Sequence, residues 1–176
     1  MNRDRPFVLC HADYFYTSDV LGPFFAALKE LVREGVVTPA QFKCYFVKTS
    51  PGQSEVKQLG LAEITACEQV EVARVEMSEC LERASCILFV DRVEGQKQPT
   101  ERFYRLLSLG KPILALVANS ECYESVGLYA KEVCVANLRD QDAIRMALAE
   151  IYRDWRRKRS ASKGKKRSQA PVAAVL

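Results

Sequence analysis

Residues 84–117 read ASCILFVDRVEGQKQPTERFYRLLSLGKPILALV, and the order of patterns in this stretch decides the fold class. The continuous apolar run from Cys86 to Val90 is typical of a strand that is covered on both faces of a sheet. A polar loop then leads into a helix predicted over residues 101–109, which Gly110 ends. The run from Pro112 to Val117 is a second buried strand. A strand, a helix and another buried strand predict a βαβ unit in a parallel sheet.

The same alternation extends along the chain in both directions. Predicted strands cover residues 7–11, 42–47, 64–67, 86–90, 112–117 and 133–135. Predicted helices cover residues 22–34, 54–61, 70–84, 101–109 and 120–126, and a final helix, capped by Asp140, has apolar positions as far as Trp155. Six strands alternating with six helices predict an α/β fold, a Rossmann-like, doubly wound parallel sheet that forms a single domain over residues 1–155.

Length and composition agree with one soluble globular domain. The chain has 176 residues, of which 48% are hydrophobic and 27% charged. No stretch approaches 18 consecutive apolar residues, so the sequence predicts no membrane-spanning helix. The N-terminal residues lead into only four apolar ones, Phe7 to Cys10, which argues against a secretory signal. We therefore expect a cytoplasmic protein.

The positive charge is concentrated at the C-terminal end. From Arg156 onward there are eight basic and no acidic residues, whereas residues 1–155 carry 18 basic and 22 acidic side chains. The sequence therefore predicts a disordered, flexible basic tail over residues 156–176 and no specific nucleic-acid partner. Three interpretations of the tail stay open: a solvated extension, electrostatic attachment of Arg156–Arg167 to an anionic membrane surface at the inner membrane face, or non-specific contact with RNA or DNA.

The seven cysteines and the single histidine, His11, do not have the spacing of a metal site. No CxxC pair occurs, and most cysteines lie in or beside apolar runs. We expect reduced, buried thiols, no zinc site and no cofactor. The sequence also contains no GxGxxG or P-loop pattern, so a dinucleotide or a P-loop ATPase site has no motif support.

A ligand site in a doubly wound sheet lies beyond the carboxyl ends of the strands, where loops and helix N-termini gather. In this sequence, that rule selects the loops over residues 11–21, 48–54, 91–100 and 118–122.

Two stretches of the chain resemble a known family. Residues 8–16, VLCHADYFY, are similar to the first strand and loop of the C-terminal, donor-nucleotide-binding half of a GT-B fold glycosyltransferase of family 4. Residues 102–115, RFYRLLSLGKPILA, resemble that family's Lys-x-x-Glu-Tyr-Leu-Ala-x-Gly-Lys/Arg-Pro helix and strand. The resemblance covers roughly residues 7–155.

The resemblance implies that a nucleoside-diphosphate sugar binds, with its base and ribose near the Gly-Lys-Pro helix and its diphosphate near the first loop. No bound metal is implied, because cationic side chains would neutralise the diphosphate. The implied donor-binding candidates are His11, Asp13, Tyr16, Lys48, Thr49, Glu101, Arg102 and Arg105. For several of these residues a structural role competes: Glu101 as an ion-pair partner of Arg105, His11 as a locally satisfied histidine and Tyr16 as a packing residue.

The sequence departs from the family at the positions that touch the donor. The family's ribose-binding Glu falls on Arg105, its partner carboxylate on Lys97, and the glycine near the diphosphate on Asp13. An arginine cannot accept hydrogen bonds from a ribose diol. The acceptor-binding half of the family also has no counterpart in these 176 residues. We therefore expect a stand-alone, diverged glycosyltransferase-like domain, a pseudoenzyme unless a separate acceptor-binding subunit completes it. The alternative is a non-catalytic protein-interaction module on the same fold.

Overall fold

Strands and helices alternate through the described part of the chain, as the sequence predicts. The structure, a computed structural model, describes residues 5–12, 18–47, 53–68, 74–91, 98–129 and 131–167. Its strands are β1 (Phe7–Ala12), β2 (Phe42–Val47), β3 (Thr65–Glu68), β4 (Cys86–Asp91), β5 (Ile113–Val117) and β6 (Val133–Asn137). Its helices are α1 (Ser18–Arg33), α2 (Gln53–Gln58), α3 (Arg74–Arg83), α4 (Glu101–Leu107), α5 (Ser120–Gly127) and α6 (Gln141–Arg167).

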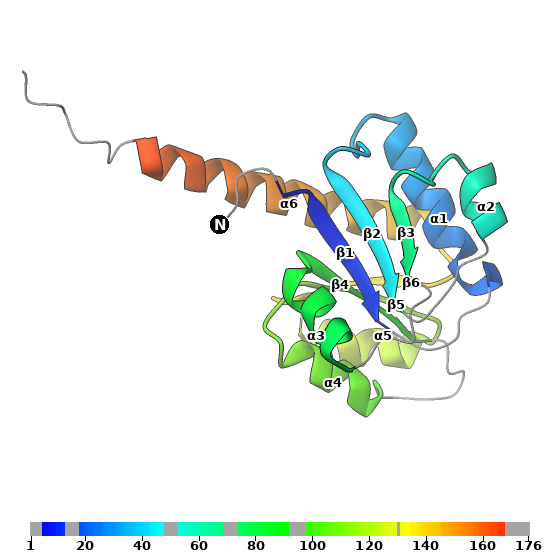
Figure 1. Ribbon diagram of the computed structural model, residues 1–176. Helices are drawn as coiled ribbons and strands as arrows, with labels where there is room; N and C mark the ends of the chain where they lie inside the picture. The colour runs from blue at the N-terminus through cyan, green and yellow to red at the C-terminus, as the bar shows by residue number, and fades with distance from the viewer. Residues whose placement is uncertain are drawn as a thin grey trace, which may run out of the picture.

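The strands form one parallel sheet in the order β3-β2-β1-β4-β5-β6 (Figure 1). This order confirms the predicted doubly wound fold. The chain winds outward from β1 to β3, and then returns to the other side of β1 with β4. The carboxyl ends of β1 and β4 therefore flank the topological switch point, where sheets of this kind bind ligands.

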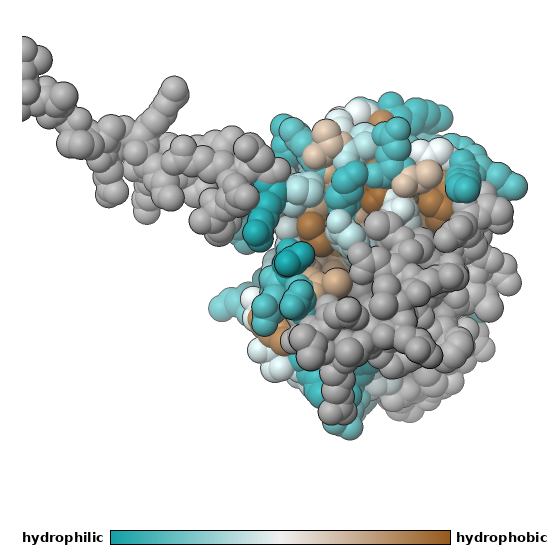
Figure 2. Space-filling view, viewed as in Figure 1, coloured by the Kyte–Doolittle hydropathy of each residue, from teal (hydrophilic) through white to brown (hydrophobic). Residues whose placement is uncertain are grey.

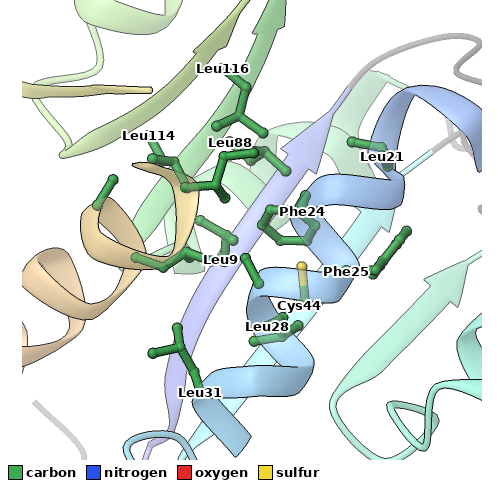
Figure 3. Packing of buried hydrophobic residues seen from close by; sticks show 14 of the residues in the cluster. Leu9, Leu21, Phe24, Phe25, Leu28, Leu31, Cys44, Leu88, Leu114 and Leu116 are labelled. Atoms are coloured by element: carbon green, nitrogen blue, oxygen red, sulfur yellow. The ribbon is translucent and has the colours of Figure 1, made fainter. Parts of the chain in front are cut away.

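Each face of the sheet is covered by its own helices, because alternate strand residues point to opposite sides. Leu9 packs with residues of α1, α2 and α6 in one core cluster, whereas its neighbour Cys10 packs with residues of α3, α4 and α5 in the other. On the α1 face, Leu9 and Leu88 of adjacent strands meet Phe24 of α1 (Figure 3). This two-sided burial explains why β4 and β5 are continuous apolar runs in the sequence.

Helix α1 begins four residues before the predicted start at Gly22 and contains Pro23. The Gly-Pro pair resembles a helix start, since proline is favoured in the first turn. In the structure, the helix continues through this pair because Leu21 and Phe24 are fully buried on its inner face. Their burial offsets the backbone hydrogen bond that a proline cannot donate.

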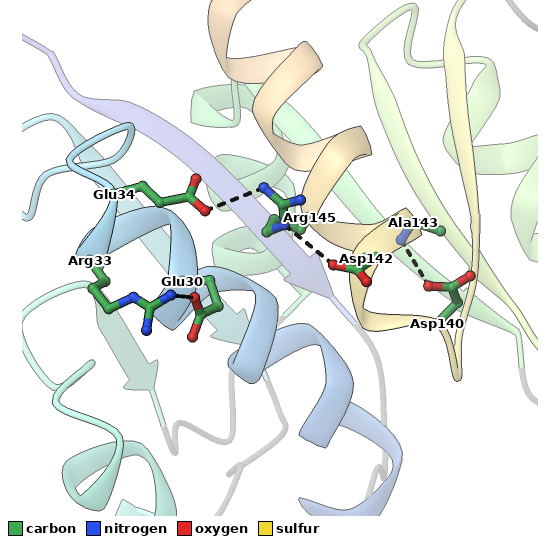
Figure 4. A network of polar contacts seen from close by, with 7 residues as sticks. All are labelled: Glu30, Arg33, Glu34, Asp140, Asp142, Ala143 and Arg145. Atoms are coloured by element: carbon green, nitrogen blue, oxygen red, sulfur yellow. Dashed lines mark hydrogen bonds and ion pairs between the residues drawn. The ribbon is translucent and has the colours of Figure 1, made fainter.

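Helix α6 shows that the predicted disordered tail is wrong for residues 156–167, which continue the helix as far as Arg167. As predicted, Asp140 caps the helix: its Oδ1 accepts a hydrogen bond of 2.9 Å from the Ala143 amide (Figure 4). The concentration of charge indicates exposure to water and not disorder, because lysine and arginine are good helix formers. Residues 168–176 lie outside the described part of the chain.

Polar contacts and aromatic rings hold α6 against α1 and the start of β1. The Arg145 guanidinium lies 3.3 Å from Glu34 Oε1 of the loop after α1, and Figure 4 shows this pair beside the Arg33–Glu30 pair. Phe7 makes edge contacts with the rings of Tyr152 and Trp155 of α6. Within the described residues, no helix combines the length and apolar composition that a membrane span needs.

Candidate functional site

The candidate site is the edge of the sheet where β1 and β4 end. Only part of it is described, because the loops after β1, β2 and β4 fall in residues 13–17, 48–52 and 92–97. Four of the sequence-predicted candidates therefore lie outside the described residues and stay predictions: Asp13, Tyr16, Lys48 and Thr49. The other four, His11, Glu101, Arg102 and Arg105, can be placed.

His11 lies in β1 and is fully buried. Its ring faces Phe46 of β2, with ring centroids 5.6 Å apart. Burial first, and then the positive charge of Arg102, lower the pKa of His11 from 6.5 to about 3. The imidazole is therefore neutral at physiological pH, so His11 does not serve as a cation for a phosphate group. The predicted pairing of His11 with Asp13 falls outside the described residues.

Arg102 is the half-buried cation of the site. It lies in the first turn of α4, and its guanidinium carbon is 6.0 Å from the centre of the Phe89 ring of β4. Burial first, and then the nearby charge of Arg105, lower the pKa of Arg102 to about 10. The side chain still carries its full charge at neutral pH. Its contact with the Phe89 ring holds the guanidinium beside the switch point.

Arg105 follows three residues later on the same face of α4, and its side chain is exposed. The alternative in which Glu101 neutralises Arg105 is not observed: both residues are described and exposed, and no ion pair joins them. The first two turns of α4 therefore present two guanidinium groups, an arrangement suited to the oxygens of a phosphate group.

Asp91 and Cys122 also lie at this edge, within two of the residue ranges selected from the sequence, but neither is among the sequence-predicted site residues. Asp91 is the last residue of β4 and is only 6% exposed. The Cys122 thiol, in the first turn of α5, donates a hydrogen bond of 3.8 Å to Asp91 Oδ2. Burial and the Asp91 charge raise the pKa of Cys122 to about 11, so the thiol stays protonated. The sequence signal that could have identified Asp91 as a site residue is its position directly after the apolar run from Cys86 to Val90.

Lys111, in the Gly-Lys-Pro stretch that carries the family resemblance, has a structural role at the opposite edge. Its ammonium donates hydrogen bonds to the carbonyl oxygens of Glu82, at 2.6 Å, and Ala84, at 2.8 Å, which terminate α3. Gly110 ends α4 with a positive φ of 62°. The most specific part of the resemblance therefore stabilises the connections into β4 and β5, away from the switch point.

Other features of the described residues do not suggest a different site. No group of three or more His, Cys, Asp or Glu side chains in this part of the chain is arranged to hold a metal ion. An open hollow lined by Thr38, Pro39 and Lys43 lies at the amino edge of the sheet, before β2. The Lys43 ammonium there already donates a 2.7 Å hydrogen bond to the Glu63 carbonyl oxygen.

The fold resembles that of a known protein in a comparison of structures, whereas comparisons of the sequence find no match. The structure matches a crystal structure of the C-terminal domain of LpcC, a glycosyl transferase group 1 family protein from Francisella tularensis. The TM-score is 0.62 at 10% sequence identity, over 88% of this chain and 84% of the LpcC domain chain. No protein-family model and no curated protein matches the sequence. The chain thus has a glycosyltransferase-like Rossmann fold.

Proposed function

We propose that this chain is a diverged nucleotide-sugar-binding domain in which Arg102 and Arg105 bind the diphosphate of the donor. The observation that carries the proposal is the half-buried Arg102 guanidinium at the switch point of a glycosyltransferase-like fold. A cation that is partly removed from water interacts more strongly with a phosphate than an exposed cation does. The net charge of −4 over residues 1–155 gives no general attraction for anions, so binding depends on such local groups.

The arginine pair determines which part of the ligand is recognised. Guanidinium groups donate hydrogen bonds but cannot accept them, so Arg105 does not bind a ribose diol as a carboxylate would. We propose that the diphosphate provides most of the affinity and that α4 contributes little selectivity for the ribose.

We further propose that this domain does not catalyse sugar transfer by itself. The imidazole and the thiol described at the edge each have a pKa far from neutrality: about 3 for His11 and about 11 for Cys122. General bases and thiolate nucleophiles work best with a pKa near the operating pH. Transfer would then need an acceptor-binding domain or subunit that brings its own reactive groups.

A thermal-shift titration of the full chain with UDP and GDP tests the binding proposal. At a nucleotide concentration of 100 times Kd, binding stabilises the folded state by about 2.7 kcal/mol. For a domain of this size that corresponds to a rise in Tm of roughly 5–10 °C. Arg102→Gln should abolish the rise, whereas Arg83→Gln should retain it, because Arg83 is an exposed arginine at the far end of α3.

Arg105→Glu separates the proposal from its competitors. We expect this change to weaken binding, since it replaces a phosphate-binding cation by an anion. Binding that appears only in Arg105→Glu would identify a decayed site that once bound the ribose diol. The absence of any shift with either nucleotide would contradict the proposal and leave the protein-interaction module as the better interpretation.

A further inference from the structure

The outer part of α6, residues 153–167, forms a basic extension of the domain. This segment contains nine basic residues and one acidic residue. The preceding turns of α6 pack against the core through Ile144, Leu148 and Tyr152, which are at most 2% exposed. Beyond them, the helix projects away from the sheet and from the other helices (Figure 1). Burial in the core accounts for the preceding turns but not for the clustered charge of the outer turns, so this charge calls for another explanation.

The base of the extension is fixed to the amino edge of the sheet. The Trp155 ring stacks on Tyr152, with centroids 5.7 Å apart, and makes an edge contact at 5.5 Å with Phe7, the first residue of β1. Arg159 lies over Trp155 at 5.1 Å and donates a 2.7 Å hydrogen bond to the Arg5 carbonyl oxygen. These contacts set the direction in which the helix leaves the domain.

Four cations of the extension are exposed to water. Arg153, Arg156, Arg157 and Lys158 are all exposed. Figure 2 shows hydrophilic side chains where α6 leaves the rest of the domain. Because residues 1–155 carry a net charge of −4, attraction to an anionic surface comes mainly from this helix.

We propose that the basic extension docks the protein onto the surface of an anionic phospholipid bilayer. Phosphate-rich membranes attract clustered basic residues near a helix end, and the attraction is screened by salt. The sequence continues after the helix with an uncharged, mostly apolar segment, APVAAVL over residues 170–176, which adds apolar surface that a bilayer can bury and a polynucleotide cannot. This proposal does not depend on the proposed nucleotide-binding function.

The observations favour a bilayer over RNA or DNA. Proteins that bind single strands combine cations with aromatic rings on which bases stack. Residues 156–167 contain no aromatic side chain, and the nearest ring, that of Trp155, already stacks within the domain. The net negative charge of the rest of the domain also opposes wrapping by a polynucleotide.

Docking through α6 has a geometric consequence. The extension leaves from the amino edge of the sheet, whereas the candidate ligand site lies at the carboxyl edge. A six-residue strand such as β1 separates these edges by about 20 Å. Attachment to a bilayer through α6 therefore leaves the candidate site open to water.

Flotation of the full chain with vesicles tests the proposal. The vesicles are phosphatidylcholine alone or phosphatidylcholine with 30 mol% phosphatidylserine, in 0.1 M or 0.5 M salt. The extension variant replaces four exposed basic residues by glutamine: Arg153, Arg156, Arg157 and Lys158. The matched control makes the same change of net charge at exposed basic residues elsewhere: Lys29, Lys57, Arg83 and Lys131.

We expect the natural chain to bind phosphatidylserine vesicles at 0.1 M salt, and not at 0.5 M salt or with phosphatidylcholine alone. Because each basic residue near the surface strengthens binding roughly fivefold, the loss of four should make the extension variant bind roughly 600-fold more weakly. The control variant should lose less than about threefold. Equal losses in the two variants, no vesicle binding by the natural chain, or displacement from vesicles by substoichiometric single-stranded RNA would each overturn the proposal. Circular dichroism of both variants verifies that α6 remains helical.

Discussion

The single histidine gives the protein a dependence of stability on pH that can be worked out in advance. His11 is fully buried and its pKa in the folded state is about 3, whereas an unfolded chain has a histidine pKa near 6.5. Below pH 6.5 the unfolded state therefore binds a proton that the folded state does not bind. The contribution of His11 to stability is complete above pH 6.5 and is progressively lost as the pH falls toward 3.

The size of this effect follows from the two pKa values. Between pH 7 and pH 5, protonation of the unfolded chain lowers the free energy of unfolding by about 2 kcal/mol. With a typical urea m-value of about 2 kcal/mol/M, the midpoint of unfolding falls by about 1 M. His11→Phe removes the titrating group and keeps an aromatic ring beside Phe46. The quantity compared is the change in the free energy of unfolding between pH 7 and pH 5, so a difference in stability between the two proteins at pH 7 does not affect the comparison. The acidic residues contribute equally in both proteins and cancel in the difference.

The assay is urea unfolding of the two proteins at pH 5, 6 and 7, together with the NMR signal of the imidazole Hε1 proton. We expect the natural protein to lose about 2 kcal/mol more than His11→Phe over this range, and the Hε1 signal not to titrate above pH 5. Equal pH dependence in the two proteins, or an Hε1 signal that titrates near pH 6.5, would refute the assignment of His11 as a buried neutral side chain.

Two further predictions concern residues on either side of the sheet. Lys111→Met removes both hydrogen bonds to the end of α3 and should lower the free energy of unfolding by about 1–3 kcal/mol. The control Lys131→Met, at an exposed position, should change it by less than about 0.5 kcal/mol. Equal urea midpoints for the two variants would contradict the capping role of Lys111. The Cys122 thiol should resist alkylation by iodoacetamide at pH 7.5, because its pKa is raised. Asp91→Asn removes the neighbouring negative charge and should speed the labelling of Cys122 relative to that of Cys86, as measured by mass spectrometry. No acceleration would exclude the Asp91 carboxylate as a cause of the raised pKa of Cys122.

The sheet could be predicted from the sequence because its central strands are covered on both faces. Such strands are continuous apolar runs, and the residues Ile87 and Leu114 can be assigned to the core without any knowledge of their partners. Helix ends were less predictable, since they depend on tertiary contacts. Pro23 in α1 is an example, because burial of its neighbours maintains a helix that local preference would interrupt.

The candidate site could be predicted only as a set of loops. Asp91 becomes significant because β4 lies next to β1, and this adjacency is a property of the strand order and not of the local sequence. Lys111 shows the reverse case, in which a stretch that resembles a binding motif has a structural role. A motif that resembles a donor-binding stretch directs attention to this residue, whereas its ammonium is engaged by two backbone carbonyl groups. For residues 156–167, composition predicts exposure to water but does not decide between a coil and a helix.

The most direct test of the central claim is chemical-shift mapping of UDP on the isotope-labelled full chain by NMR. We predict that the backbone amide shifts concentrate at the ends of β1 and β4 and in the first turns of α4, around Arg102, and that they disappear in Arg102→Gln. Shifts confined to residues 153–167 of α6 would mean that the nucleotide binds only to the basic extension, and that result, like the absence of any shift, would contradict the claim.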